Sequence, residues 1–359
     1  MPLRIPLLQN TIAPRSTIPG WAAAFCLGVA LAVGLTPTTG CRSIFTHSTL
    51  PSQLSDQDFW TLANDLSEPS GTFTHSDNLV SNEILFADTM RTLRLRGSVY
   101  IGVGPEQNFT YIATLQPAMA FIVDVRAENR SLHLLYKALF EIAEDRADFV
   151  SRLFSRDRPP DVGAGFPVED LFARYASVPP QARLRDETAR LVRERLLAQH
   201  GFGLTPRDLT WIDYAFNAFY TDGPDIHYAR LLPNDPPGPS YRTLMTTKDV
   251  VGRTRSYLSS DDAFAFVKGL QARNLIVPVI GDFGGPTALR RIGEYVRAHG
   301  EIVSAFYGSN VEVYLNRMQT GTFCLNLAML PRTRSSWFIS SKNKQFLRTK
   351  IEACAGGRK

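Results

Sequence analysis

The stretch from Ser98 to Arg126 constrains the fold most, because glycines separate a short apolar run from an apolar-periodic segment. The run at 99–103 is too short for a helix, whereas residues 107–115 have helical spacing. The pattern therefore predicts a strand, a glycine turn and a helix. A second apolar run at 119–125 predicts another strand, so we expect the opening βαβ unit of a parallel sheet.

This unit carries the residue types of a nucleotide-binding turn. Gly102 and Gly104 let the backbone turn sharply and come close to a ligand, and the following helix N-terminus adds partial positive charge. Asp124 closes the second strand twenty residues after Gly104, where a carboxylate can accept two hydrogen bonds from a ribose. Gln107 stands where the dinucleotide pattern has its third glycine. Both a ligand site and a tight turn without a ligand therefore remain open.

The rest of the chain alternates helices and strands, which predicts an α/β fold, a Rossmann-like three-layer sandwich with a mostly parallel sheet and a helical insertion. The other expected elements are helices at 57–66, 81–93, 129–154, 261–272 and 286–299, and strands at 275–280, 301–307 and 311–315. In such folds ligands bind beyond the carboxyl ends of the strands. We expect the polar turns 102–108, 124–126 and 281–285 to gather there.

The chain is expected to divide into six segments. These are an export signal or anchor (1–41), a linker with a first helix (42–80), the first half of the α/β domain (81–160), a helical cap insertion (161–240), the second half (241–330), and a basic tail (331–359). The insertion contains three predicted helices and a proline-rich loop, and its place between strands is typical of a lid over a substrate.

The N-terminus resembles an export signal. Arg4 and Arg15 precede the apolar run 21–35, which is shorter than the roughly twenty residues of a membrane span. Small residues then lead to Thr39-Gly40-Cys41, which resembles a bacterial lipobox with Cys41 as the lipidated residue. Lipidation, an uncleaved anchor and a cleaved signal all place the domain in the cell envelope, facing the periplasm or exterior. A misassigned start codon would leave it cytoplasmic.

Composition narrows the classes of partner. The formal charge of +5 comes from basic residues mixed with acids, so no nucleic-acid partner is expected. Cys26 and Cys41 lie in the N-terminal module. Cys324 and Cys354 remain, and a disulfide or two unpaired thiols are both open. No metal is expected, since no Cys-x-x-Cys or Cys/His cluster occurs.

Two residues are candidates for catalysis. Asp282, in Gly-Asp-Phe-Gly-Gly, has either a turn role or a ligand role; a kinase is excluded because the other kinase motifs are absent. His227 lies in the insertion, near Asp213, Tyr214 and Asp222 in the sequence, and is either an acid/base group or an ordinary loop histidine. No serine lies in Gly-x-Ser-x-Gly, so the usual hydrolase elbow is missing.

The glycine turn and its acids resemble class I S-adenosylmethionine-dependent methyltransferases. Those enzymes have a glycine-rich first loop, an acid ending the second strand and often an acidic or polar loop after the fourth, which Asp282 would match. The acid that usually precedes the first glycine is absent, since Tyr100 and Ile101 stand there. The resemblance implies a cofactor site made of Gly102, Gly104, Glu106, Asn108, Asp124 and Asp282. It places the two glycines and Glu106 beside the methionine part, Asp124 on the ribose and Asp282 near the methyl donor.

The resemblance implies an S-adenosylmethionine-binding, methyltransferase-like protein. The alternative is an exported, membrane-anchored lipoprotein that keeps a degenerate Rossmann-like fold as a non-catalytic binding or structural protein. The segments GVGPEQNF and FIVDVR also resemble an uncharacterised bacterial family. A nicotinamide or flavin enzyme would use the same turn and acid, but no Tyr-x-x-x-Lys pair accompanies them.

Overall fold

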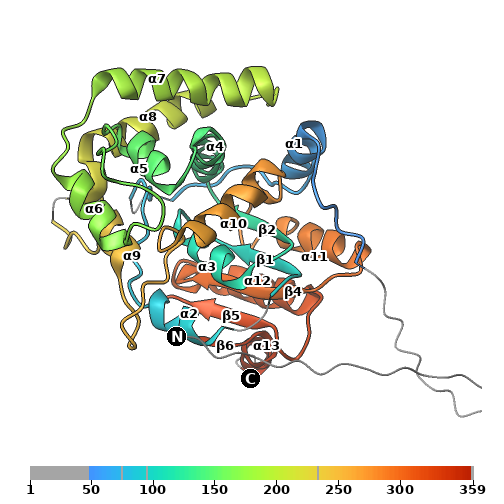
Figure 1. The fold of residues 1–359 in the computed structure, drawn as a ribbon. Coiled ribbons are helices and arrows are strands. Elements are labelled where there is room, and N and C mark those ends of the chain that lie inside the picture. The colour runs from blue at the N-terminus through green and yellow to red at the C-terminus, as the bar shows by residue number, and fades with distance from the viewer. Residues whose placement is uncertain (1–47, 74–75, 94–95, 233, 357–359) are drawn as a thin grey trace, which may run out of the picture. The chain divides into compact units, whose positions relative to one another are not determined.

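The computed structural model describes residues 48–73, 76–93, 96–232 and 234–356, and a six-stranded sheet lies at its centre (Figure 1). The strand order is β3-β2-β1-β4-β5-β6, with all neighbours parallel except β5 and β6. The strands are β1 (Val99–Gly102), β2 (Met119–Asp124), β3 (Ile276–Ile280), β4 (Val303–Ser309), β5 (Trp337–Ser340) and β6 (Lys344–Phe346). The predicted α/β class with a mostly parallel sheet is confirmed.

Strands β1, β2 and β3 are mostly apolar because helices cover both faces of the sheet. Every residue of β1, β2 and β3 is buried, as expected for parallel strands packed on two sides. Pro278 interrupts the hydrogen-bond donors of β3, which is tolerated because β3 is an edge strand. In the register, Gly102 lies opposite Ile122 and Asp124 opposite Ile280, so these strands end at one edge of the sheet.

Helices cover the sheet in two layers. The α-helices are α1 (Asp56–Asp65), α2 (Phe86–Thr92), α3 (Gln107–Leu115), α4 (Ala127–Ile142), α5 (Arg146–Phe154), α6 (Val168–Ala176), α7 (Ala182–Arg193), α8 (Pro206–Asp222), α9 (Tyr241–Thr246), α10 (Asp261–Ala272), α11 (Ala288–Ala298), α12 (Arg317–Met329) and α13 (Leu347–Gly356). Helices α3 and α4 pack with α10, and α11 packs with α12. Right-handed crossovers put these two groups on opposite faces, because the chain crosses the sheet from β1 to β3 in one direction and returns to β4 in the other.

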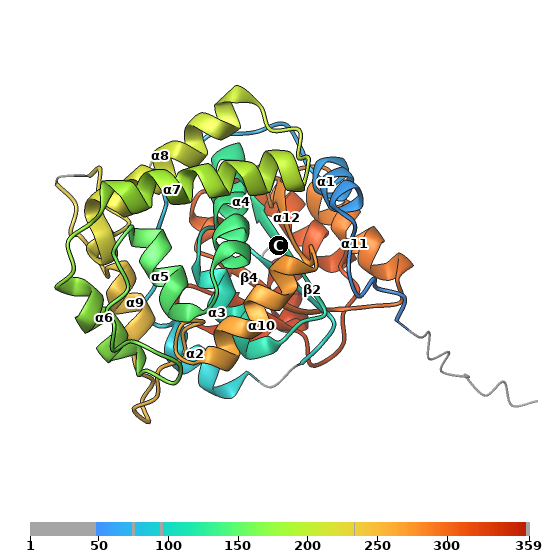
Figure 2. The same ribbon diagram turned by 45° about the horizontal axis from the view of Figure 1, so that its top comes forward.

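The insertion packs on α4 as a further helical layer (Figure 2). Besides α6, α7 and α8 it contains a π-helix (Glu194–Gln199) and a 3-10 helix (Gly223–Asp225). Helix α8 begins with a capping box of Thr205 and Asp208. The Asp208 carboxylate also accepts hydrogen bonds from Arg130 and Ser131 of α4. One acid thus both starts the helix and attaches it to the core.

Three local predictions differ from the structure. Residues 311–315, predicted as a strand, contain a 3-10 helix (Val311–Val313). The helix predicted at 129–154 is two helices, because Ala143 leaves the helical conformation and Asp145 caps α5. The predicted tail 331–359 instead supplies β5, β6 and α13. Phe338 of β5 is buried against Phe306 of β4, so this short apolar stretch extends the sheet.

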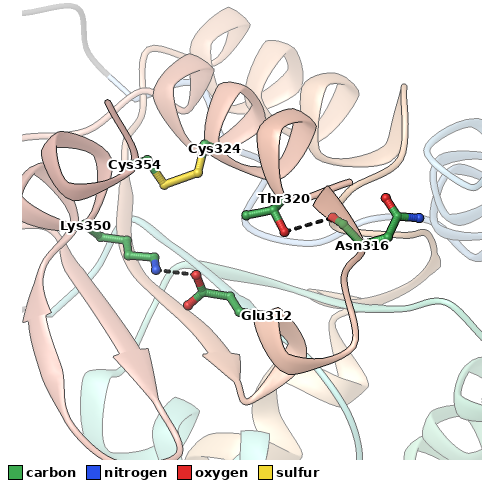
Figure 3. The surroundings of a disulfide bond; sticks show 6 residues. All are labelled: Glu312, Asn316, Thr320, Cys324, Lys350 and Cys354. Atoms are coloured by element: carbon green, nitrogen blue, oxygen red, sulfur yellow. Dashed lines mark hydrogen bonds and ion pairs between the residues drawn. A yellow bond between two sulfur atoms is a disulfide. The ribbon is translucent and has the colours of Figure 1, made fainter. Parts of the chain in front are cut away.

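A disulfide joins the last two helices (Figure 3). Cys324 of α12 and Cys354 of α13 are bonded, which settles the pairing left open by the sequence. Beside it, Lys350 of α13 forms an ion pair with Glu312 in the loop after β4. The C-terminal helix is therefore fixed both to α12 and to that loop.

No helix in the described ranges is long and apolar enough to cross a membrane. The proposed signal segment and Cys41 lie outside the described residues.

Candidate functional site

A cavity of about 380 Å³ opens at the carboxyl ends of β1, β2, β3 and β4. Its volume is within the range of about 300–1,000 Å³ typical of small-molecule sites. Residues 71–73, 78 and 81–83 and the start of α12 complete its wall. The cavity lies where the strand order reverses between β1 and β4, which is the usual ligand position in open α/β sheets.

The glycine turn after β1 forms one side of the cavity. Gly104 lines it with φ of +77°, a conformation that favours glycine, and a Cβ atom there would meet nothing within 4 Å. The Asn108 amide donates to the carbonyl oxygens of Val103, Gly104 and Pro105 and thereby holds the turn. The backbone at Gly104 is thus both fixed and open to close approach.

His133 of α4 also holds the glycine turn in place. Its Nε2–H donates to the Gly104 carbonyl at 2.8 Å, and its Nδ1 is buried without a hydrogen-bond partner. Burial lowers the pKa of His133 to about 4, so the ring is neutral at physiological pH. His133 therefore acts as a fixed donor to the turn.

Asp124 ends β2 and lines the cavity beside Arg126. Its Oδ1 accepts hydrogen bonds from the Arg126 backbone nitrogen at 3.0 Å and from Nε at 3.1 Å. Its Oδ2 has only a 3.4 Å contact with Arg126 Nη2. Oδ2 therefore retains capacity to accept a further hydrogen bond from a ligand hydroxyl.

Asp282 lines the cavity after β3, the third strand in chain order. The match to a loop after the fourth strand was therefore wrong. Its Oδ1 accepts from Gly284 N, and its Oδ2 accepts from Gln319 Nε2, both at 2.8 Å. Glu68 fixes the turn by accepting from the backbone nitrogens of Asp282 and Thr287. The carboxylate is thus oriented by two separate elements.

Glu83 is a further carboxylate in the cavity wall. It lies at the β4 side of the cavity, whereas Asp282 lies at the β3 side. It accepts hydrogen bonds from the Ser309 hydroxyl and from the side chain of Tyr307, both at the end of β4. Burial raises the pKa of Glu83, and these two hydroxyls offset only part of that shift. Ser309 has φ of +48°, a strained conformation for a residue with a Cβ, next to a register shift in the β4–β5 ladder.

The charge of the cavity wall is negative. Glu83, Asp124 and Asp282 line it, and Arg126 is the one basic side chain among the described lining residues. Because Arg126 is paired with Asp124, the remaining two carboxylates have no cationic partner in the wall. Such a site favours a ligand with positive charge.

Three predicted cofactor residues do not line the cavity. Gly102 is packed against Asn108 and Tyr100, while Glu106 and Asn108 are fully buried. The Glu106 carboxylate accepts from Ser81 N, and burial raises its pKa to about 8. These residues support the turn from the core side.

His227 also lies outside the cavity wall. Its Nδ1 is buried without a hydrogen-bond partner. Tyr214 and Asp222, expected to accompany it, instead bind Arg230, which also pairs with Asp77. The insertion contributes only its neighbour Tyr228 to the described lining residues. The expectation that residues 161–240 close over a substrate stays a prediction.

Sequence reasoning missed Glu83, Tyr307, Ser309 and Gln319. Ser309 and Asn310 follow a predicted strand in a polar loop, and that was the available signal. Glu83 was interpreted only as part of a helix start, although helix α2 begins at Phe86. No cluster of three or more potential metal ligands occurs in the described part of the chain.

Comparison with known proteins places the chain in a family. Residues 78–160 and 240–354 match a family model described as a domain of unknown function, DUF7790. The matched segments cover more than half of the chain, so the protein belongs to this family. They contain Glu83, Gly104, Asp124 and Asp282 and omit most of the insertion. No match was found among curated proteins.

Proposed function

We propose that this DUF7790 protein binds S-adenosylmethionine in the cavity at the strand ends and is a methyltransferase-like enzyme. The observation that carries the proposal is that Gly104, Asp124 and Asp282 line one negatively charged cavity. Its negative charge suits a sulfonium ligand, whereas the pyrophosphate of a nicotinamide or flavin dinucleotide would be repelled. Bound S-adenosylmethionine would supply an activated methyl group for transfer.

The strand order supports this proposal because it is the order expected of a Rossmann-like domain. The order β3-β2-β1-β4-β5-β6 is that of doubly wound nucleotide-binding sheets, with β6 reversed in direction. The residues fit an adenosyl ligand: Asp124 Oδ2 can accept from a ribose hydroxyl, and Gly104 leaves its backbone approachable. Arg126 holds the Asp124 carboxylate in position by two hydrogen bonds to Oδ1.

The test is calorimetric titration of the full-length protein with S-adenosylmethionine and S-adenosylhomocysteine. We expect binding in the wild type and at least tenfold weaker binding in Asp124→Asn, because a charged acceptor is lost. The exposed residue Asp262 provides a matched control, since Asp262→Asn removes the same charge away from the cavity. Absence of binding at millimolar ligand by a folded protein would contradict the proposal.

The disulfide favours a second candidate function, an exported binding protein anchored through Cys41. Disulfides persist in oxidising compartments such as the periplasm, and Cys324–Cys354 is bonded. In this case the cavity serves to bind a ligand without methyl transfer. Metabolic labelling with a radioactive fatty acid tests anchoring: Cys41→Ala should lose the label and Cys26→Ala should retain it. Labelling that survives in Cys41→Ala, or is absent in the wild type, rejects lipidation.

A further inference from the structure

We propose that Glu83 binds the ammonium group of an amino-acid moiety on the ligand. This proposal rests on the proposed function and specifies which end of the cavity receives which part of the ligand. It assigns the β2–β3 end to the nucleoside and the β4 end to a cationic tail.

The Glu83 carboxylate lies in surroundings that favour a cationic ligand. Its partners in the protein are the hydroxyls of Ser309 and Tyr307, and no ion pair involving Glu83 is found among the described residues. A carboxylate that lines a cavity and is partly desolvated gains most from a cationic ligand, because the local dielectric constant is low. An ammonium group also offers three donors for carboxylate and amide acceptors.

The end of β4 beside Glu83 contains a strained residue. Ser309 adopts a positive φ at a register shift of β4, which is a strained conformation for a residue other than glycine. The strained residue directs its hydroxyl to Glu83, across 226 residues of sequence. Strain of this kind concentrates at ligand sites. Asn82 and Asn310 add neutral polar groups to the same part of the wall.

The acids of the cavity wall are spread along the carboxyl ends of the strands. Asp124 and Asp282 lie at the ends of β2 and β3, whereas Glu83 contacts the end of β4 beyond β1. A nucleoside at Asp124 therefore extends past the glycine turn at Gly104 before it reaches Glu83. A ligand with a ribose at one end and an ammonium group at the other matches both ends.

Three probes separate the parts of the ligand. S-adenosylhomocysteine carries the amino-acid tail, 5′-methylthioadenosine lacks it, and N-acetyl-S-adenosylhomocysteine keeps the carboxylate but has no ammonium charge. For Glu83→Gln in the full-length protein we expect at least tenfold weaker binding of S-adenosylhomocysteine and unchanged binding of the other two. Glu187→Gln, on the charged surface of α7, is the matched control and should bind all three as the wild type does.

The outcomes distinguish this proposal from the proposed function. If Glu83→Gln binds S-adenosylhomocysteine as tightly as the wild type does, or binds all three probes equally more weakly, Glu83 does not bind the ammonium group. The proposed nucleoside site is not contradicted by either result. If the wild type binds none of the probes, both proposals fail.

A measurement on the wild type covers the case in which Glu83→Gln does not fold. Titrations at several pH values, in buffers of different ionisation enthalpy, should show net proton release with S-adenosylhomocysteine wherever Glu83 is partly protonated, since an arriving cation favours ionised Glu83. No release is expected with 5′-methylthioadenosine. The groups around Glu83 are Tyr100, Tyr111 and Tyr307, whose pKa values are all raised, so they stay neutral. The same proton release with both ligands would contradict an ammonium site.

Discussion

The side-chain amide of Gln319 donates a 2.8 Å hydrogen bond to Oδ2 of Asp282, joining the first turn of α12 to the loop after β3. Gln319 itself lines the cavity. Its role is to present the Asp282 carboxylate in one orientation, because Oδ1 is already held by Gly284 N.

Gln319→Leu should therefore weaken S-adenosylhomocysteine binding about 5- to 30-fold, the effect of about 1–2 kcal/mol for a hydrogen bond to a charged group. Calorimetry measures the affinity. Thr320→Ala, whose hydroxyl bonds only to its own helix at Asn316, serves as control and should bind normally. Equal affinities for Gln319→Leu and wild type would show that the Asp282 orientation does not matter for binding.

Gly102→Ala should destabilise the fold by about 3 kcal/mol or more, through overpacking in the core. A Cβ atom at this position would lie 1.9 Å from Asn108 Oδ1 and 2.5 Å from the Tyr100 hydroxyl oxygen. Urea unfolding measures the change. Gly269→Ala in α10 is the matched control: nothing lies within 4 Å, so the helix should gain about 0.5–1 kcal/mol. A stable Gly102→Ala protein would refute the packing described here.

Stability should fall between about pH 5 and pH 8 because of Glu106. Its folded-state pKa of about 8 is above the ordinary value of 4.5, so the unfolded state releases its proton first as pH rises. The stability that protonated Glu106 contributes is fully present below pH 4.5 and is lost as the pH approaches 8. Relative to Glu106→Gln, the wild type should lose up to about 4 kcal/mol across this window. Urea unfolding of both proteins at several pH values tests this, and parallel pH profiles would contradict it.

Reduction of the disulfide should lower the free energy of unfolding by about 3–4 kcal/mol, as expected for a cross-link closing a loop of this size. The bonded cysteines are 30 residues apart in sequence. Unfolding with and without dithiothreitol measures the loss. The double variant Cys324→Ala and Cys354→Ala should show the reduced stability in both conditions. A wild type indifferent to dithiothreitol would mean that the bond adds no stability.

The βαβ unit was predictable because its signals are local. Short apolar runs, glycines and helical spacing between 98 and 126 decide the conformation within thirty residues, and the structure reproduces them. The end of the chain was not predictable in the same way. Phe338 lies in a short apolar stretch surrounded by polar residues, and it forms a strand only because Phe306 of β4 offers a partner.

The candidate site was predictable only in part, for the same reason. Gly104 and Asp124 belong to one local pattern, and Asp282 lies in a marked glycine turn. Glu83 and Ser309 meet because residues 81–83 line the cavity beside the end of β4, and no local pattern encodes a contact between segments so far apart in the sequence. Gly102, Glu106 and Asn108 were assigned to the ligand, yet Gly102 is packed against Asn108 and Tyr100, and the side chains of Glu106 and Asn108 are buried.

The chain leaves the sheet domain after α4 and returns before α10. The segment between these two helices supplies one described residue to the cavity wall, Tyr228, which lies in a turn. A block attached in this way can be lengthened, shortened or exchanged in evolution without rerouting a strand. Members of the family are therefore expected to differ most in this block. The residues at the strand ends can stay the same while the block changes.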